Sequence, residues 1–156
     1  MTLRPARHDD RAWLLTLVHD ERIAASLSPL AADALHQALD DADGGVLIIE
    51  SDGERAGVIC WTTKNRRSRI AGIHTVAVHT DHQGRGLAVT AIREAARLLF
   101  DEHGFHRIEA ETYGFNTPAR RAFVAAGFTE EGVRRRAYDR RGAWQDGIHF
   151  GLLTDD

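Results

Sequence analysis

The chain has 156 residues, of which 43% are hydrophobic and 28% are charged. Domains usually comprise about 100–150 residues, so residues 1–156 predict a single domain with a core of its own. Twenty basic residues against 23 acidic ones give a net charge of −3, which argues against nucleic acid or an anionic membrane as the partner.

Targeting and redox signals are absent from the sequence. No apolar run approaches the ~18–20 residues that a membrane span requires, and residues 1–10 contain no apolar signal core. Cys60 is the only cysteine, which excludes an internal disulfide and a cysteine-based metal cluster. We therefore expect a soluble, cytoplasmic protein that holds no metal.

The first forty residues predict two helices. Asp9 or Asp10 can cap a first helix whose apolar residues follow a helical period. Ser28-Pro29 supplies an N-cap and a first helical position for a second helix.

Strands follow these helices. Val46–Glu50 and Arg55–Thr62 predict a hairpin around Asp52-Gly53, a strong turn signal. Ser68–His79 predicts a third, longer strand. The turn-forming residues between these segments are glycine and aspartate rather than proline.

The second half alternates helix and strand. A helix follows Gly86, a strand covers His106–Tyr113, and a short helix covers Asn116–Ala126. Two more strands follow, at about Thr129–Asp139 and Ala143–Leu153. The expected order βααβββαβαββ predicts an α/β fold with a mixed sheet that contains at least one parallel pair.

Residues 75–88 (TVAVHTDHQGRGLA) predict an anion site, because a strand leads through a glycine-containing loop into a helix. The free N–H groups and the positive dipole end of such a helix favour phosphate. The loop lacks the G-x-x-x-x-G-K-[ST] pattern, and Val89 stands where a dinucleotide fingerprint needs its third glycine. Each glycine alone could serve only a tight turn.

Gln83–Ala88, read as Q-x-x-G-x-A, resembles the pyrophosphate loop of the GNAT superfamily of acyl-CoA-dependent N-acyltransferases. Asn116–Ala119 and Gly127-Phe128 resemble the family's N-x-x-[AS] helix and the Gly-Phe pair that ends it. The tail, at 130–134 and 144–146, is similar to the branch of ribosomal-protein N-terminal acetyltransferases. The resemblance runs from about Arg55 to the C-terminus and implies a mixed central sheet of about six to seven strands, flanked by about four helices and splayed between the fourth and fifth strands.

The resemblance implies acetyl-CoA as the acyl donor, lying across the splay. Arg85, Arg120 or Arg121 would hold its 3′-phosphate, although such arginines also suit an ordinary solvated helix face. The residues expected to bind the donor are Val76, Val78, Gln83, Gly84, Arg85, Gly86, Leu87, Ala88, Asn116 and Arg121.

Direct transfer to an amine needs a general base, because alkyl amines are protonated at neutral pH. The resemblance gives this role to Glu111, with Glu109 on the same strand face as the alternative. His74, expected to share a face with Val76 and Val78, is a secondary candidate for proton relay. The backbone N–H of Val78 is expected to stabilise the oxyanion.

Two positions depart from the family pattern. Phe123 stands where many relatives carry a tyrosine that protonates the departing thiolate, and Ala119 replaces a serine of the ribosomal type. Tyr138 or Tyr113 is therefore the candidate acid.

The acceptor is left open among a protein α-amine, a lysine and a small-molecule amine. The alternatives to an enzyme are a catalytically weak acyl-CoA-binding regulatory module and a plain interaction domain. A homodimer through the last strands also stays open.

Overall fold

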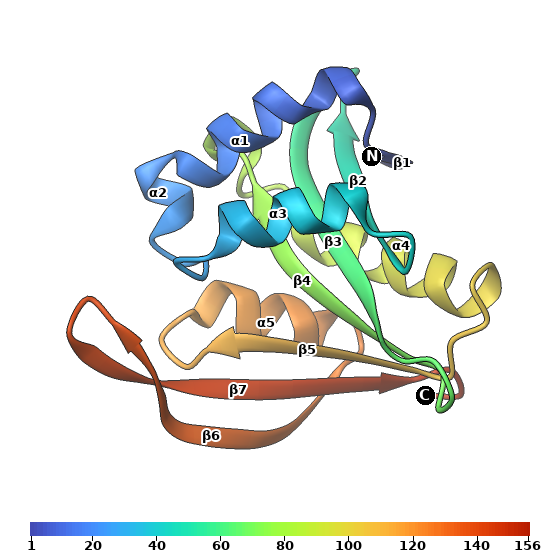
Figure 1. Cartoon of the computed structure of the whole chain (residues 1–156), viewed down its shortest axis with the longest axis vertical. Helices are drawn as coiled ribbons and strands as arrows, with labels where there is room; N and C mark the ends of the chain where they lie inside the picture. The colour runs from blue at the N-terminus through green and yellow to red at the C-terminus, as the bar shows by residue number, and fades with distance from the viewer.

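Seven strands form one mixed sheet in the order β1-β2-β3-β4-β5-β7-β6, in a computed structural model that describes residues 1–156 (Figure 1). Only β4 and β5 are parallel, and all other neighbours are antiparallel. The strands are β1 (Thr2–Pro5), β2 (Gly44–Ser51), β3 (Glu54–Asn65), β4 (Ile70–Val78), β5 (Arg107–Tyr113), β6 (Thr129–Arg140) and β7 (Ala143–Leu153). The predicted mixed α/β sheet is confirmed.

Helices cover both faces of this sheet. They are α1 (Arg11–His19), α2 (Glu21–Ala24), α3 (Ala31–Asp40), α4 (Leu87–Asp101) and α5 (Thr117–Ala125), one more than the four predicted. The additional helix is α2, a single turn that Asp20 caps by accepting a hydrogen bond from the Arg22 N–H. Its four residues are too few to show a helical period in the sequence.

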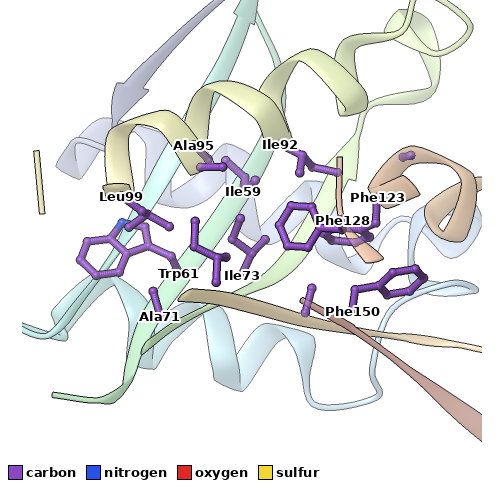
Figure 2. Packing of buried hydrophobic residues seen from close by; sticks show 14 of the residues in the cluster. Ile59, Trp61, Ala71, Ile73, Ile92, Ala95, Leu99, Phe123, Phe128 and Phe150 are labelled. Atoms are coloured by element: carbon purple, nitrogen blue, oxygen red, sulfur yellow. The ribbon is translucent and has the colours of Figure 1, made fainter. Parts of the chain in front are cut away.

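Alternating side chains of the central strands build a core on each face. Val46 and Val58 pack with α1 and α3 on one face, whereas Leu47 and Ile59 pack beneath α4 on the other. Figure 2 shows this second core, in which Ile92 and neighbouring side chains of α4 meet the sheet beside three phenylalanines. The helices therefore hold the sheet rigidly on both sides of its centre.

The predicted turn between β2 and β3 is confirmed, whereas the predicted start of α3 is not. Asp52 and Gly53 adopt φ of 53° and 77° in the turn between β2 and β3, as predicted for a tight hairpin. The prediction that α3 starts at Ser28-Pro29 is wrong by two residues. Ser28 forms a separate turn there, accepting hydrogen bonds on Oγ from Leu30 N–H and on its carbonyl from Ala31 N–H.

A β-bulge in β4 overturns the predicted side-chain alternation. His74 and Ala77, three residues apart, oppose residues that are only two apart in β3, and Thr75 between them takes a φ of 51°. His74 therefore shares the α3 face with Ala77, while Val76 and Val78 pack on the α4 face. The prediction that all three share a face is wrong, because it assumed a regular strand.

Asp10 does not cap α1 with its side chain, although it directly precedes the helix. The carboxylate is fully buried, and it accepts hydrogen bonds from Arg4 at 2.7 Å, from Arg55 at 2.8 Å and from the Arg7 N–H at 2.7 Å. The Arg4 guanidinium holds the pKa of Asp10 well below its usual range. This network joins β1, the start of α1 and β3.

We predict that Asp10→Asn lowers the free energy of unfolding at pH 7 by about 3 kcal/mol, the low end for breaking a buried ion pair, because Arg4 and Arg55 are partly exposed. Since the folded pKa is lowered, the contribution is complete above the unfolded value of about 3.9 and is lost as the pH falls below it. Urea unfolding at several pH values measures this. Asp9→Asn, at an exposed neighbour, is the control, and an equal effect of both variants would contradict the assignment.

Candidate active site

The sheet opens between β4 and β5. The two strands pair from Ile70–Ile73 to Arg107–Ala110, and beyond these residues the paired register ends, as predicted for the splay. Two cavities meet at this opening, which we name the donor cavity (about 690 Å³) and the acceptor cavity (about 500 Å³). Residues lining both are Ser26, Leu27, Val76, Asn116, Ala119 and Phe123.

The donor cavity contains the residues that the sequence predicts for acyl-donor binding, with one exception. Gly84 and Gly86 line it with φ of 81° and 72°, and a methyl group at either position would meet no atom within 4 Å, so their backbone is open to a ligand. The other predicted residues on its wall are Val76, Val78, Gln83, Leu87, Ala88, Asn116 and Arg121. Arg85 is the exception.

The start of α4 gives the donor cavity an anion-binding character. This fifteen-residue helix begins at Leu87, and no side chain caps its first turn. Its first N–H groups are therefore free to donate, and the helix dipole adds partial positive charge at the same point. Gln83 supports the loop from within, since its Nε2 donates to the Val78 carbonyl at 3.0 Å.

The arginines near this loop differ in their contacts. Arg121 lines the donor cavity, and Arg22, which sequence reasoning missed, also lines it while pairing with Asp20 at 3.0 Å. Arg85 lies against Asp52 at 3.4 Å. Arg120 is bonded to the Gly114 carbonyl and to Glu130. Of the three arginines predicted for the 3′-phosphate, only Arg121 therefore faces the cavity.

The acceptor cavity is acidic. Asp41 and Glu111 both line it, and no lysine or arginine does. His74, Tyr113 and Tyr138 complete its ionisable lining. Glu109, the alternative base, lies outside it and contacts Lys64 and Arg107 instead.

Glu111 is the centre of a hydrogen-bond network. The Tyr138 hydroxyl donates to its carboxylate, the His149 Nε2 lies 3.0 Å from it, and an Arg134 Nη lies at 3.8 Å. Burial and the bond to Glu111 raise the pKa of Tyr138 to about 12, so the phenol keeps its proton at neutral pH. Gly147 makes room for this pair, because a Cβ there would lie 2.6 Å from the carboxylate.

His74 lies in the acceptor cavity with its Nδ1 3.0 Å from the Thr75 hydroxyl. Burial lowers its pKa below the usual value, and the negative charge of Asp41 opposes this only in part. The imidazole is therefore mainly neutral at pH 7, the form that can accept a proton.

Comparison with known proteins agrees with this architecture. Residues 9–128 match the sequence profile of the Acetyltransferase (GNAT) family. The chain belongs to this family. No helix of this GNAT chain combines the length and apolar character that crossing a membrane would need, and no group of three or more metal-ligating side chains gathers in it.

Among GNAT relatives, the chain is 30% identical over 110 residues to the SPbeta prophage-derived uncharacterized N-acetyltransferase YokL of Bacillus subtilis, covering 70% of this chain and 62% of YokL. It is 32% identical over 135 residues to the mycothiol acetyltransferase of Sanguibacter keddieii, covering 80% and 42%. The chain thus spans less than two thirds of these curated relatives. Its fold is similar to that of a spermidine N-acetyltransferase from Vibrio cholerae, with a TM-score of 0.85, 20% identity and coverage of 99% and 95%. The ribosomal-protein branch stays a prediction.

Phe123, which departs from the GNAT pattern, is part of the core. Its ring packs between those of Phe128 and Phe150, with centroids 5.1 and 5.4 Å away (Figure 2). The backbone N–H of Ala119 donates to the Asn116 side chain, which caps α5. Neither position offers a hydroxyl, and the Tyr138 hydroxyl is bonded to Glu111.

Sequence reasoning missed His149 and Arg134, which contact Glu111 from β7 and β6. The sequence indicates the contact with His149 only through strand pairing, because His149 lies directly opposite Glu111 in the β5–β7 register. It could have been found only by aligning these two strands.

We predict that His74 titrates below its usual value of about 6.5, measured from its ring resonances by NMR. Asp41→Asn should lower the pKa of His74 further, because the aspartate raises it, whereas Asp40→Asn should leave it unchanged. With a depressed folded pKa, the stability contribution of the neutral ring is lost as the pH falls below about 6.5. A His74 pKa at or above 6.5 would contradict the prediction that burial lowers it.

Proposed function

We propose that this chain transfers an acetyl group from acetyl-CoA to a cationic primary amine, by direct transfer assisted by a general base. The observation that carries the proposal is the meeting of two cavities of opposite electrostatic character at the β4–β5 opening. One has the free N-terminus of α4 and Arg121, and the other has Glu111 and Asp41.

The residues of the donor cavity fit acetyl-CoA. Open glycine backbone at Gly84 and Gly86 suits a pyrophosphate, Arg121 suits a phosphate, and thirteen of the 22 lining residues are hydrophobic, which suits a thin pantetheine arm. When bound, acetyl-CoA supplies an acyl carbon activated as a thioester.

The backbone N–H of Val78 in β4 is available at the opening, whereas its carbonyl accepts from Gln83. The His79 N–H donates to Ala56 of β3, so the preceding residue, Val78, turns its N–H and carbonyl to the opposite edge of the strand. That edge has no β5 partner beyond Ile73. This supports Val78 as the donor that stabilises negative charge on the acyl oxygen.

Glu111 is proposed as the base. An alkyl ammonium has a pKa near 10.4, so one proton must leave before the nitrogen can attack. Glu111 takes up that proton, the amine nitrogen bonds to the acyl carbon, and the C–S bond breaks. The departing sulfur takes up the second proton that the nitrogen loses, which leaves the neutral N-acetyl amide and the CoA thiol. Tyr138 and His149 hold the carboxylate in place from two sides, and we propose that Tyr138 orients the base rather than protonating the thiolate.

The acceptor is proposed to carry positive charge beyond the reacting amine. Asp41 lies on the acceptor cavity in addition to Glu111, and no lysine or arginine lines it. The similar fold of the spermidine N-acetyltransferase agrees with a polyamine. The predicted kinship with ribosomal-protein acetyltransferases makes a peptide α-amine the second acceptor to test.

A catalytically weak acyl-CoA-binding module is the second candidate function. The buried Phe123 ring and the methyl side chain of Ala119 favour it, because neither can protonate a leaving thiolate. This candidate predicts binding without turnover.

We predict that acetyl-CoA at about 100 times its Kd stabilises the protein by about 2.7 kcal/mol, which raises the melting temperature by several degrees. NADH and ATP serve as controls. A specific shift with no thiol release over spermidine, a diamine, lysine and a free peptide would support the binding module. No shift at millimolar acetyl-CoA would overturn both candidates.

We further predict that Glu111→Gln lowers kcat by about 10²–10⁴-fold, the usual contribution of a general base, while the Kd for acetyl-CoA stays unchanged. The amide can still accept the Tyr138 hydrogen bond, so the fold of the cavity is preserved. Glu109→Gln is the matched control, since it changes a carboxylate on the same strand outside the cavity. Thiol release and calorimetry measure the two quantities, and equal activity of both variants would refute the role of Glu111.

A further inference from the structure

Arg140, the last residue of β6, forms no ion pair with a carboxylate, although only 9% of its surface is exposed. We infer that Arg140 is a positioning residue that clamps the segment Ala24–Ser28 against β5 and so fixes one wall of the acceptor cavity. The inference rests on the proposed function, because the wall matters only if an amine binds there.

The guanidinium is bonded to backbone rather than to acids. Its Nη1 donates to the Leu27 carbonyl at 2.6 Å, and its Nη2 donates to the carbonyls of Ala24 and Ala25, both at 2.7 Å. The three carbonyls lie at or just beyond the end of α2, where a helix leaves its last acceptors without helical partners, and that of Ala24 also accepts from the Leu27 N–H at 3.1 Å. One side chain therefore holds the single turn of backbone from Ala24 to Leu27, which lies more than a hundred residues away in the sequence.

Two aromatic rings of β5 and the following loop hold the guanidinium from the other side. Its central carbon lies 5.2 Å from the centroid of Tyr113 and 5.9 Å from that of Phe115, and these two rings stack on each other at 5.1 Å. A cation over ring faces is attracted by their quadrupoles. Arg140 thus links the segment to Tyr113, which itself lines the acceptor cavity.

The segment has few other anchors. Ile23 is the only buried residue between positions 21 and 30, and within Ala24–Ser28 only Leu27 packs against the core, where it is partly buried. Apolar burial therefore holds this stretch weakly. Its backbone hydrogen bonds are local, such as those from the Ser26 N–H to Ile23 and from the Leu27 N–H to Ala24. Apart from Arg140, the hydrogen bond that reaches it from a distant element is a long one of 3.4 Å, from the Asn116 side chain to the Ser26 carbonyl. We conclude that the attachment of Ala24–Ser28 to β5 depends mainly on Arg140.

The segment Ala24–Ser28 lines the walls of both cavities, so the bonds from Arg140 affect the shape of the site. Ser26 and Leu27 line both cavities, and Ser28 lines the acceptor cavity. The donor cavity is also lined by the loop from Gln83 to Gly86 and by the start of α4, whereas in the acceptor cavity this segment shares the lining with Glu111 and Tyr138. Loosening the segment should therefore weaken amine binding more than acetyl-CoA binding.

Arginine is suited to this position, because its planar group presents five donors in a fixed fork and lies flat on rings. A lysine would keep the charge but has one compact ammonium, which cannot reach three carbonyls and stack at once. Arg140→Lys is therefore expected to restore only part of what Arg140→Ala removes.

The test is steady-state kinetics of the full chain with the best amine of the panel. We expect Arg140→Ala to raise the KM for the amine by about tenfold, and the KM for acetyl-CoA by less than about threefold. Guanidinium ion, well below denaturing concentration, should lower the amine KM of this variant, whereas urea and sodium chloride should not. Arg141→Ala is the control, because this neighbour is exposed and makes no hydrogen bond or ion pair with another side chain.

A merely structural role predicts a different result. It would lower the amount of folded enzyme and hence the maximal rate, leave both KM values unchanged and show no guanidinium rescue, and that outcome would overturn the inference. If Arg140→Ala does not fold, Arg140→Lys gives the same comparison. Hydrogen exchange over residues 21–30 should be faster in the variants than in the wild type, and unchanged exchange would also refute the clamp. An inactive wild type with normal folding would instead refute the proposed function.

Discussion

The end of pairing between β4 and β5 after Ile73 and Ala110 is the constraint on which the rest of the site depends. Two parallel strands that stay in register would hydrogen-bond along their whole length and leave no backbone free. Their separation exposes one edge of β4 and opens space that α3 covers on one face and α5 on the other. The donor cavity, the acceptor cavity and the junction at Val76 all follow from this separation.

The two helical layers make the separation stable. On the α4 face, Phe123, Phe128 and Phe150 fill the space beside the diverging strands (Figure 2). The phenylalanine at position 123 therefore has a packing role where a tyrosine would place a hydroxyl. Aromatic packing at the junction and a polar network around Glu111 divide the opening into an apolar and an acidic side.

The features that could be predicted from the sequence depend on residues that are adjacent in the chain. Gly84 and Gly86 adopt the positive φ values that such a loop needs, and Asp52-Gly53 forms the turn that its residues favour. The bulge at Thr75 has no such signal, since a β-branched residue at positive φ is uncommon. It reversed the face of His74, and no pattern of apolar residues in Ser68–His79 reveals it.

The unpredicted contacts are those made across long sequence separations. Arg140 and Leu27 are 113 residues apart, and His149 reaches Glu111 only through the β5–β7 register. Such contacts depend on how the last hairpin packs against the first helices. Half of the residues of the donor cavity come from the single stretch 76–92, whereas the acceptor cavity is assembled from the loop after α2 and from α3, β4, β5, α5 and β6. A loop motif can therefore specify the donor, while the acceptor is set by residues that come together only in the folded chain.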